Sequence, residues 1–269
     1  MTNIVITGCS SGIGLESALY LKDKDIKVYP TARKKEDVKK LKEMGFEAFY
    51  LDVRDYESIK NVIKEVLERD GKIDVWFNNA GYGQPGALED VKTEVLKEQF
   101  ETNVFGLHEA TKEVLKVMLK QGYGKIIQHS SVLGLVAMPF RGAYNASKYA
   151  VEGLTDTLRL ELKDTNIHVT LLNTGPIESR FRENAKKNLK NNIDIKNSRF
   201  RDIYEKTLKS EKSNVPFTLP ATAVAEVVYK IILSKKPKPR YYITKATHLL
   251  GFAKRVLSTS LLDKILIRF

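Results

Sequence analysis

Tyr144 and Lys148 are the residues whose types and spacing suggest acid–base chemistry. The segment Tyr144-Asn145-Ala146-Ser147-Lys148 separates them by four positions, which places both side chains on one face of a helix. A free tyrosine has a pKa of about 10, and a nearby ammonium group lowers that pKa by favouring the phenolate. Such a tyrosine could exchange a proton with an alcohol or carbonyl oxygen while a hydride moves elsewhere. Taken alone the pair is ordinary, because tyrosine and lysine share many helix surfaces.

Two polar positions elsewhere could join this pair. Ser130 and Ser131 follow a predicted strand over residues 125–129, and Ser131 precedes Tyr144 by thirteen residues. The carboxyl ends of strands line the ligand crevice in doubly wound sheets, so a hydroxyl there could hold a substrate oxygen, or it could cap the next turn. Asn103 lies within a predicted helix, where asparagine is unfavourable. It either bonds to backbone or anchors a kink or a water beside the site.

A glycine-rich turn near the start of the chain predicts a dinucleotide phosphate site. It lies between a predicted strand over residues 3–7 and a predicted helix over 14–22, which is where such a site belongs. Its glycines permit a sharp turn and a close approach of backbone to a diphosphate, and the helix start presents free N–H groups and a positive dipole. The predicted cofactor contacts here are Gly8, Ser10, Ser11, Gly12, Ile13 and Gly14.

The end of the second predicted strand, residues 26–31, favours NADP(H) over NAD(H). An acidic residue at this point would bind the ribose 2′-hydroxyl of NAD, whereas an arginine suits a 2′-phosphate. The sequence has no acid here, and Arg33 follows directly after Ala32. A planar guanidinium can bind phosphate through two hydrogen bonds. The alternative for Arg33 is a solvated surface charge.

Three more turns at strand ends could complete a cofactor site. Asp52-Val53 closes the third predicted strand, where a carboxylate could meet the adenine amino group or simply cap a turn. Asn79-Ala80-Gly81 closes the fourth, where small residues allow close approach of a ligand or form a plain turn. Gly175-Pro176-Ile177 follows the sixth strand and would let a ring pass close to backbone.

The elements that position these residues alternate between apolar runs and amphipathic segments. Strands are predicted over residues 3–7, 26–31, 48–51, 74–77, 125–129, 168–172 and 241–244, and helices over 14–22, 36–44, 56–69, 93–121, 144–162 and 221–233. This alternation predicts an α/β fold, a Rossmann-type doubly wound parallel sheet with helices on both faces. We divide the chain into a single catalytic domain, residues 1–245, with a substrate loop at about 177–220, and a basic amphipathic helical tail, residues 246–269.

The composition fits one soluble globular domain of 269 residues, with 42% hydrophobic and 29% charged residues. The single cysteine, Cys9, can form neither an internal disulfide nor, alone, a zinc site. We therefore predict no metal site and a reducing, cytoplasmic setting. The start of the chain has no basic region followed by a long apolar run, so we expect no signal peptide.

The net charge of +12 is concentrated late in the chain, because residues 186–269 carry 19 Lys and Arg against six Asp and Glu. A solvated, lysine-rich surface is the simplest explanation, and we expect no nucleic-acid partner, because no aromatic-interleaved basic motif is present. The tail combines leucines such as Leu250 and Leu262 with Lys254 and Arg255. It could lie on an anionic membrane, which would place the protein at the inner membrane face. Packing on the domain or on a partner subunit is favoured.

The order of these motifs resembles the short-chain dehydrogenase/reductase family over residues 1 to about 180. The glycine loop of that family is TGCSSGIG here, and its N-A-G turn is Asn79–Gly81. The resemblance implies a catalytic tetrad of Asn103, Ser131, Tyr144 and Lys148. In the family the lysine also holds the nicotinamide ribose, and a proton relay runs through it to a water at the asparagine. Tyr144 and Lys148 are therefore also expected to contact the cofactor.

The same resemblance selects Ser131 over Ser130, because the family's serine-to-tyrosine spacing falls on it. It also implies that Ile177 and Ser179 contact the nicotinamide carboxamide. The segments TGCSSGIGLESA, TARKKEDV and KPKPRYYITKATHLLGF are similar to the 17β-hydroxysteroid dehydrogenase-like branch, which includes bacterial NADP-dependent aldehyde reductases. Two departures are Thr174, where proline usually precedes Gly175, and Ser179, where threonine is common. Thr174 is expected to loosen its loop.

These observations predict an NADP(H)-dependent oxidoreductase that interconverts a carbonyl, either an aldehyde or a ketone, and its alcohol. Tyr144 would be the general acid or base. Met138, Phe140 and Phe217 suggest an apolar substrate, and we expect a homo-oligomer, either a dimer or a tetramer. The alternative is a catalytically silent NADP-binding sensor or scaffold, against which the four filled tetrad positions argue.

Overall fold

The computed structural model describes residues 1–210 and 215–268, so residues 211–214 of the predicted substrate loop and Phe269 of the predicted tail lie outside the described part. Seven parallel strands form one sheet in the order β3-β2-β1-β4-β5-β6-β7. The strands are β1 Thr2–Ile6, β2 Ile26–Ala32, β3 Phe49–Tyr50, β4 Val75–Asn78, β5 Gly124–Ser131, β6 Ile167–Thr174 and β7 Arg240–Tyr242. The predicted doubly wound α/β fold is confirmed.

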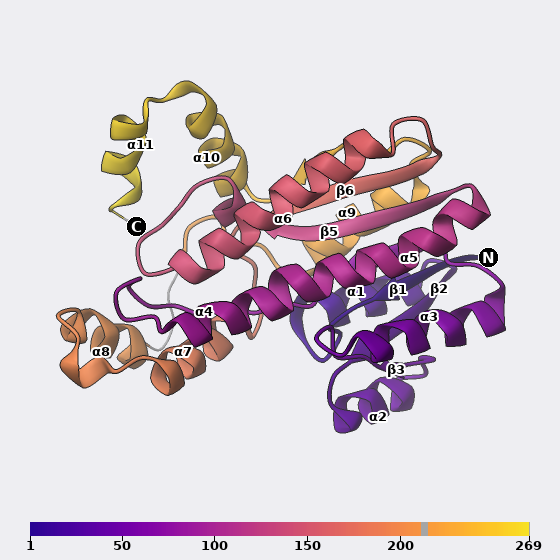
Figure 1. The fold of residues 1–269 in the computed structure, drawn as a ribbon, viewed down its shortest axis with the longest axis horizontal. Helices are drawn as coiled ribbons and strands as arrows, with labels where there is room; N and C mark the ends of the chain where they lie inside the picture. Colours follow the sequence, from indigo (N-terminus) through magenta and orange to yellow (C-terminus); the bar gives the residue numbers. More distant parts are fainter. Residues whose placement is uncertain (211–214, 269) are drawn as a thin grey trace.

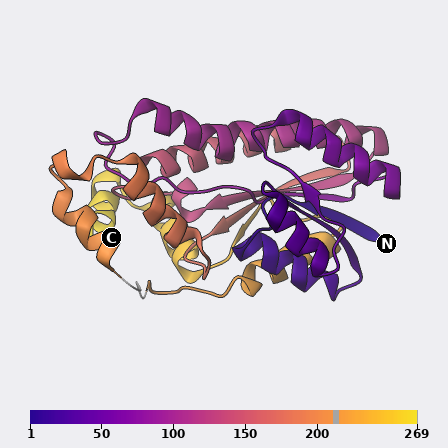
Figure 2. The ribbon, with the colours of Figure 1, turned by 90° about the horizontal axis from the view of Figure 1, so that it is seen from below.

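Helices cover both faces of this sheet (Figures 1 and 2). One face carries α1 Gly12–Lys22, α2 Lys35–Glu43 and α9 Thr222–Leu233, and the other carries α3 Tyr56–Asp70, α5 Leu107–Gln121 and α6 Gly142–Glu161. The strands are apolar because they are buried from both sides. In β1, Ile4 and Ile6 pack on the first face, whereas Val5 packs on the second.

The predicted helix over residues 93–121 is interrupted near its middle. It consists of α4 Thr93–Phe100 and α5, joined by a π-helical turn at Glu101–Gly106. A side chain at Gly106 would place its Cβ only 2.6 Å from the carbonyl oxygen of Val53, so glycine allows this turn to approach the end of β3. Such π turns frequently occur at functional sites, and Asn103 lies inside this one.

The segment after β6, which showed no clear sequence pattern, contains α7 Phe181–Asn192 and α8 Arg201–Lys209, with a 3₁₀ turn at Ile195–Asn197 between them. These polar helices are held by a small apolar cluster of Leu189, Ile193 and Tyr204. Phe140, expected near the substrate, packs into this cluster instead, with its ring centroid 5.0 Å from that of Phe200. Phe217 is 50% exposed.

The tail forms two helices, α10 Lys245–Val256 and α11 Thr259–Leu266. The Thr244 and Ser258 side chains cap their N-termini by accepting hydrogen bonds from Thr247 N and Leu261 N. Both helices lie at the same end of the molecule as α7 and α8 (Figure 1). Across the described ranges, no helix is both long enough and apolar enough to cross a bilayer.

Candidate active site

Tyr144 and Lys148 lie in the first turns of α6, on one face as predicted. The ammonium nitrogen of Lys148 is 5.6 Å from the centroid of the Tyr144 ring. It donates a hydrogen bond of 2.6 Å to the carbonyl oxygen of His129 in β5. Lys148 is only 5% exposed, so its charge is held inside the protein by a backbone carbonyl beside the tyrosine.

The protonation of this pair differs from the expectation drawn from the sequence. Burial raises the pKa of Tyr144 to about 12, against the opposing effects of a hydrogen bond with Ser131 and the charge of Arg141. Burial lowers the pKa of Lys148 to about 8, although the nearby Glu152 carboxylate acts in the other direction. The pKa of Tyr144 is therefore raised where the sequence led us to expect a lowered one, because desolvation of the phenol dominates. At neutral pH Tyr144 is a protonated phenol.

The two serines at the end of β5 have different surroundings. Ser130 is fully buried, and its hydroxyl donates to the Glu152 carboxylate. The Ser131 hydroxyl accepts a hydrogen bond of 3.1 Å from Leu133 N in the 3₁₀ turn Val132–Gly134 and lies beside Tyr144. This geometry places Ser131, the serine selected above, next to the tyrosine.

Glu152 is a buried acid that the sequence reading did not single out. Its carboxylate accepts hydrogen bonds of 2.6 Å from Asn173 Nδ2 and 3.1 Å from Arg240 Nε, in addition to the bond from Ser130. Its signal in the sequence is its position four residues after Lys148, on the same face of α6. It connects the catalytic helix with β5, β6 and β7.

Asn103 connects the π turn to α6. Its carboxamide accepts a hydrogen bond of 3.1 Å from Tyr82 N and donates one of 2.9 Å to Tyr82 O. It also donates to the Ser147 hydroxyl at 3.2 Å, and Ser147 donates to the Tyr144 carbonyl at 2.8 Å. The expected bonding of Asn103 to backbone is thus observed, within a π turn, whereas its role as an anchor for a water stays a prediction.

The side chains of His129 and Thr174 form a hydrogen bond close to Lys148, which donates to the backbone carbonyl of His129. The Nε2 atom of His129 lies 3.1 Å from the Thr174 hydroxyl, and its Nδ1 lies 3.1 Å from the Asn79 carboxamide oxygen. Burial, with the charge of Lys148, lowers the pKa of His129 to about 3, so the ring is neutral. The expected loosening at Thr174 is wrong, because its hydroxyl bonds to His129 and to Ser130 O. Proline could not make these bonds.

The glycine loop and the Asn79–Gly81 turn fit together closely. Gly8 has a φ of +76°, which favours glycine. A Cβ on Gly14 would lie 2.4 Å from Gly8 O, so a side chain there would push the loop apart. Asn79 Nδ2 donates to Thr7 O at 2.9 Å and to Gly8 O at 3.1 Å. These contacts hold two of the predicted cofactor turns against each other.

The start of α1 is open to an anion. Ser11 occupies the N-cap position, but its side chain makes no capping hydrogen bond, so the first-turn N–H groups, including that of Ile13, have no partner in the helix. Ser10 is exposed, and Ala80 contacts Gly8. The arrangement is a cradle of backbone donors and the positive end of a helix dipole, which fits a dinucleotide diphosphate.

The loop after β6 faces this cradle. A Cβ on Gly12 would lie 3.1 Å from the Cβ of Ser179. The loop is fixed by hydrogen bonds from Leu219 N to Pro176 O at 3.1 Å and from Glu178 N to Leu219 O at 2.9 Å. Ser179 therefore lies beside the glycine loop, and the expected contacts of Ile177 and Ser179 with the nicotinamide carboxamide stay predictions.

Arg33 and Asp52 lie at the carboxyl ends of neighbouring strands, together with Arg54. The Asp52 carboxylate accepts hydrogen bonds from Arg54 Nε at 3.3 Å and Arg54 NH2 at 3.1 Å. Burial opposes ionisation of Asp52, but these bonds, with a smaller contribution from the Arg33 charge, keep its pKa below the usual value. Arg54, which the sequence reading did not select, adds a second guanidinium beside Arg33. Val53 follows Asp52 and contacts Gly106.

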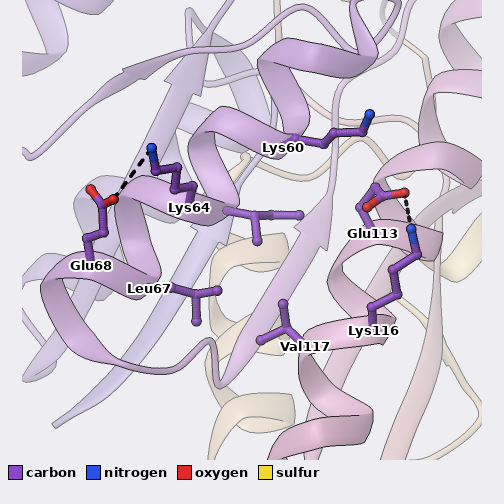
Figure 3. A pocket seen from close by; sticks show the side chains of 8 residues that line it. Lys60, Lys64, Leu67, Glu68, Glu113, Lys116 and Val117 are labelled. Atoms are coloured by element: carbon purple, nitrogen blue, oxygen red, sulfur yellow. Dashed lines mark hydrogen bonds and ion pairs between the residues drawn. The ribbon is translucent and has the colours of Figure 1, made fainter.

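Apolar side chains enclose Tyr144 on the substrate side. The Phe181 ring of α7 lies 5.4 Å from the Tyr144 ring, measured between centroids, and Met138 packs in the same cluster as Tyr144. A separate surface groove between α3 and α5 is lined by Leu67, Val117 and several charged residues (Figure 3). None of the predicted site residues lines that groove, so it is not the site of this chemistry.

Comparison with known proteins identifies the family. A family model described as short chain dehydrogenase matches residues 2–190. An uncharacterized oxidoreductase of Escherichia coli K12, YbbO, is 39% identical over 98% of this chain and 93% of its own length. The NADPH-dependent 3-dehydrocapnine reductase of Ornithobacterium rhinotracheale is 32% identical over 98% and 96%. The 3-ketodihydrosphingosine reductase of Bacteroides thetaiotaomicron is 33% identical over 93% and 90%.

Solved structures agree with this assignment. The chain superimposes on an actinorhodin polyketide ketoreductase with NADPH at a TM-score of 0.74, with 30% identity and coverage of 93% and 97% of the two chains. It also matches a Burkholderia phymatum short-chain dehydrogenase/reductase in complex with NAD at a TM-score of 0.74, with 25% identity and coverage of 95% and 92%. Both types of nicotinamide cofactor thus occur among its structural neighbours. The chain belongs to the short-chain dehydrogenase/reductase family of oxidoreductases.

Proposed function

We propose that this protein is an NADP(H)-dependent reductase of an apolar ketone or aldehyde. The observation that carries the proposal is the position of the Tyr144 ring, whose centroid lies 5.6 Å from the ammonium nitrogen of the buried Lys148. The raised pKa of Tyr144 agrees with it. A phenol that keeps its proton at neutral pH suits a general acid. Reduction is therefore the favoured direction, with Tyr144 as the proton donor to the carbonyl oxygen.

The remaining tetrad residues position this proton transfer. Bound NADPH would supply the hydride. Ser131, beside Tyr144, would hold the carbonyl oxygen through its hydroxyl, and Lys148 would keep a positive charge near the phenol as the proton leaves. Developing charge on the oxygen is stabilised most by donors that are already oriented. Asn103 would keep α6 in register through Ser147.

The preference for NADP(H) is supported by two guanidinium groups. Arg33 is exposed beyond the end of β2, and Arg54 lies near it across Asp52. Arginine can bind a 2′-phosphate with charge-assisted hydrogen bonds, and the positions where an acid would bind the ribose hydroxyls of NAD carry Arg33 and Lys34 instead. Asp52 is held by Arg54, so it is less available to meet an adenine amino group.

The apolar character of the substrate is supported by the side chains around Tyr144. Met138 shares its apolar cluster, and Phe181 covers it from α7. Pockets of this kind bind apolar surface and use few polar groups to orient the reacting atom. Names of two relatives state that they reduce ketones, 3-ketodihydrosphingosine and 3-dehydrocapnine.

The test measures NADPH oxidation with ketones and aldehydes of increasing chain length. Tyr144→Phe should lower kcat/KM by about a hundredfold to ten-thousandfold, the usual contribution of general acid catalysis, while NADPH binding is retained. Tyr149→Phe is the matched control, because Tyr149 lies in the same helix, is exposed, and its hydroxyl donates to Leu135 O, apart from the hydrogen bonds of the tetrad described above. Near-normal rates for Tyr144→Phe would contradict the mechanism. Tight NADPH binding without turnover of any compound would favour the silent sensor or scaffold.

A further inference from the structure

The tail helices have two different sides. On the inner side, Leu250, Ala253 and Leu257 of the α10 segment pack with Leu262 and Leu266 of α11 into one apolar cluster. This cluster also contains Val132, Leu133, Val136, Met138 and Tyr144. The tail is therefore bound to its own domain, at the carboxyl edge of the sheet where the candidate active site lies.

The outer side remains apolar although it faces solvent. We call it the tail face and define it by six exposed side chains, which are Leu249, Phe252, Val256, Leu261, Ile265 and Ile267. Phe252 is 66% exposed and Leu249 is 60% exposed. Positions 249, 252 and 256 follow helical spacing on α10, and 261 and 265 do so on α11. A concentration of large exposed apolar residues indicates a binding surface.

The segment that carries the tail face is also basic. Residues 245–268 contain Lys245, Lys254, Arg255, Lys264 and Arg268, against one acid, Asp263. Among residues 1–210 and 215–268, no carboxylate lies within ion-pairing distance of any of these five cations. The charges are therefore unneutralised within the described chain. The surface requires a partner that is both apolar and anionic.

We propose that the tail face docks the protein on an anionic lipid bilayer as a peripheral amphipathic surface. Amphipathic helices with basic flanks lie in the bilayer interface and are attracted by anionic headgroups. A second copy of this chain fits less well, because a two-fold interface would bring the same basic residues together. The charge pattern thus selects a lipid surface over a homodimer.

Docking through this face would hold the active-site end of the molecule against the membrane. The inner side of the same two helices packs with Tyr144, and α7 and α8 lie at the same end of the fold (Figure 2). If the substrate is apolar, a point that rests on the proposed function, it could reach Tyr144 from the lipid phase. The docking itself does not depend on catalysis.

The test is sedimentation of the full-length protein with vesicles of phosphatidylcholine alone or mixed with phosphatidylglycerol. Wild type should bind the mixed vesicles and should bind the neutral ones at least about tenfold more weakly. Lys254→Glu/Arg255→Glu should lower binding to mixed vesicles by at least about tenfold. Its control is Lys235→Glu/Lys236→Glu, the same charge change at exposed positions before β7, which should bind like wild type.

The apolar part of the tail face is tested by Leu249→Ser/Phe252→Ser. This variant should also lose most of its vesicle binding, whereas Leu160→Ser, at a 67% exposed leucine of α6, should not. NADPH binding is measured for each variant to show that its fold is intact. This control does not require the protein to be catalytically active. Equal sedimentation of wild type and both tail variants would overturn the proposal. So would a change from dimer to monomer in the tail variants without any change in vesicle binding, because a second copy would then be the partner.

Discussion

Two regions of the molecule are stabilised by different kinds of contact. The first is the cofactor half, formed by β1 to β4 and their turns, and the second is the substrate end, formed by α7, α8, α10 and α11. In the cofactor half, the turns are held through backbone atoms, because Gly14 approaches the carbonyl of Gly8 and the Asn79 side-chain amide donates to Thr7 O and Gly8 O. At the substrate end, apolar side chains from separate helices pack around Tyr144. Under the proposed function, the cofactor would be recognised mainly by backbone geometry, whereas the substrate would be recognised by apolar side chains.

Among the variants that compare these two regions, the largest effect on cofactor binding is expected for Gly14→Val in the cofactor half. Because a Cβ there would lie 2.4 Å from Gly8 O and 2.6 Å from Asn79 Nδ2, the loop must move. NADPH affinity, measured by fluorescence titration, should fall about tenfold to a hundredfold, as overpacking costs of 1–3 kcal/mol imply. Gly153→Ala in α6, where a Cβ meets nothing within 4 Å, should keep full affinity. Unchanged NADPH affinity in Gly14→Val would contradict the claim that backbone packing of the glycine loop determines cofactor binding.

Arg33→Asp should change which cofactor is used without disturbing the loop. Removal of charge-assisted hydrogen bonds, about 1.5–3 kcal/mol, predicts a kcat/KM for NADPH that is lower by about tenfold to a hundredfold, and a rise for NADH. Lys34→Asp, the same change one residue later, should have less effect. Equal losses in the two variants would assign the effect to overall charge, and an unchanged preference would move the phosphate contact to Arg54, Ser11 or Lys34.

The pH dependence should come from Lys148. Burial lowers its pKa to about 8, so its positive charge is present below that pH and is lost as pH rises through it. Tyr144, with a pKa of about 12, stays protonated over the same range. The kcat/KM for NADPH, which reports groups of the free enzyme, should fall by up to about tenfold per pH unit above pH 8. Arginine stays charged throughout this range, so Lys148→Arg should lack this decline. A wild-type profile that stays flat well above pH 8 would contradict the assignment.

The smallest effect is expected for Phe181→Ala at the substrate end. Its ring contacts Tyr144 from α7, and loss of such an aromatic contact predicts a KM for the carbonyl substrate that is about threefold to tenfold higher. The dissociation constant for NADPH should stay unchanged and serves as the internal control. If NADPH binding weakens as much as substrate binding, the two regions are not independent.

The sequence predicts the cofactor half well because its signals are local. Glycines at fixed offsets after an apolar strand specify a turn independently of the rest of the fold. Gly8, Gly14 and Asn79, which the sequence assigns to the cofactor site, lie next to one another in the structure. The roles of these residues and of the tetrad in catalysis stay predictions until tested. The spacing of Tyr144 and Lys148 likewise fixes their common helix face.

At the substrate end, the amphipathic pattern predicts the helical tail, which forms α10 and α11. The helices α7 and α8 could not be predicted because they are stabilised by contacts distant in sequence. Polar α7 and α8 are held by a few residues such as Leu189 and Tyr204, which pack with Phe140. The protonation of Tyr144 depends on burial, which no local pattern reveals. The hydrogen bonds of His129 with Asn79 and Thr174 could not be predicted either, because the three residues are far apart in the sequence.

The central claim is that this protein transfers hydride from NADPH to an apolar carbonyl with Tyr144 as the acid. The most direct measurement uses NADPH in which both hydrogens on C4 of the nicotinamide are deuterium, with mass spectrometry of the alcohol formed from a long-chain ketone. We expect one deuterium on the carbinol carbon with wild type and with Tyr149→Phe, and labelled alcohol formed at least about a hundredfold more slowly with Tyr144→Phe. Deuterated alcohol formed at a normal rate by Tyr144→Phe, or no labelled alcohol from NADPH-bound wild type with any carbonyl compound, would contradict it.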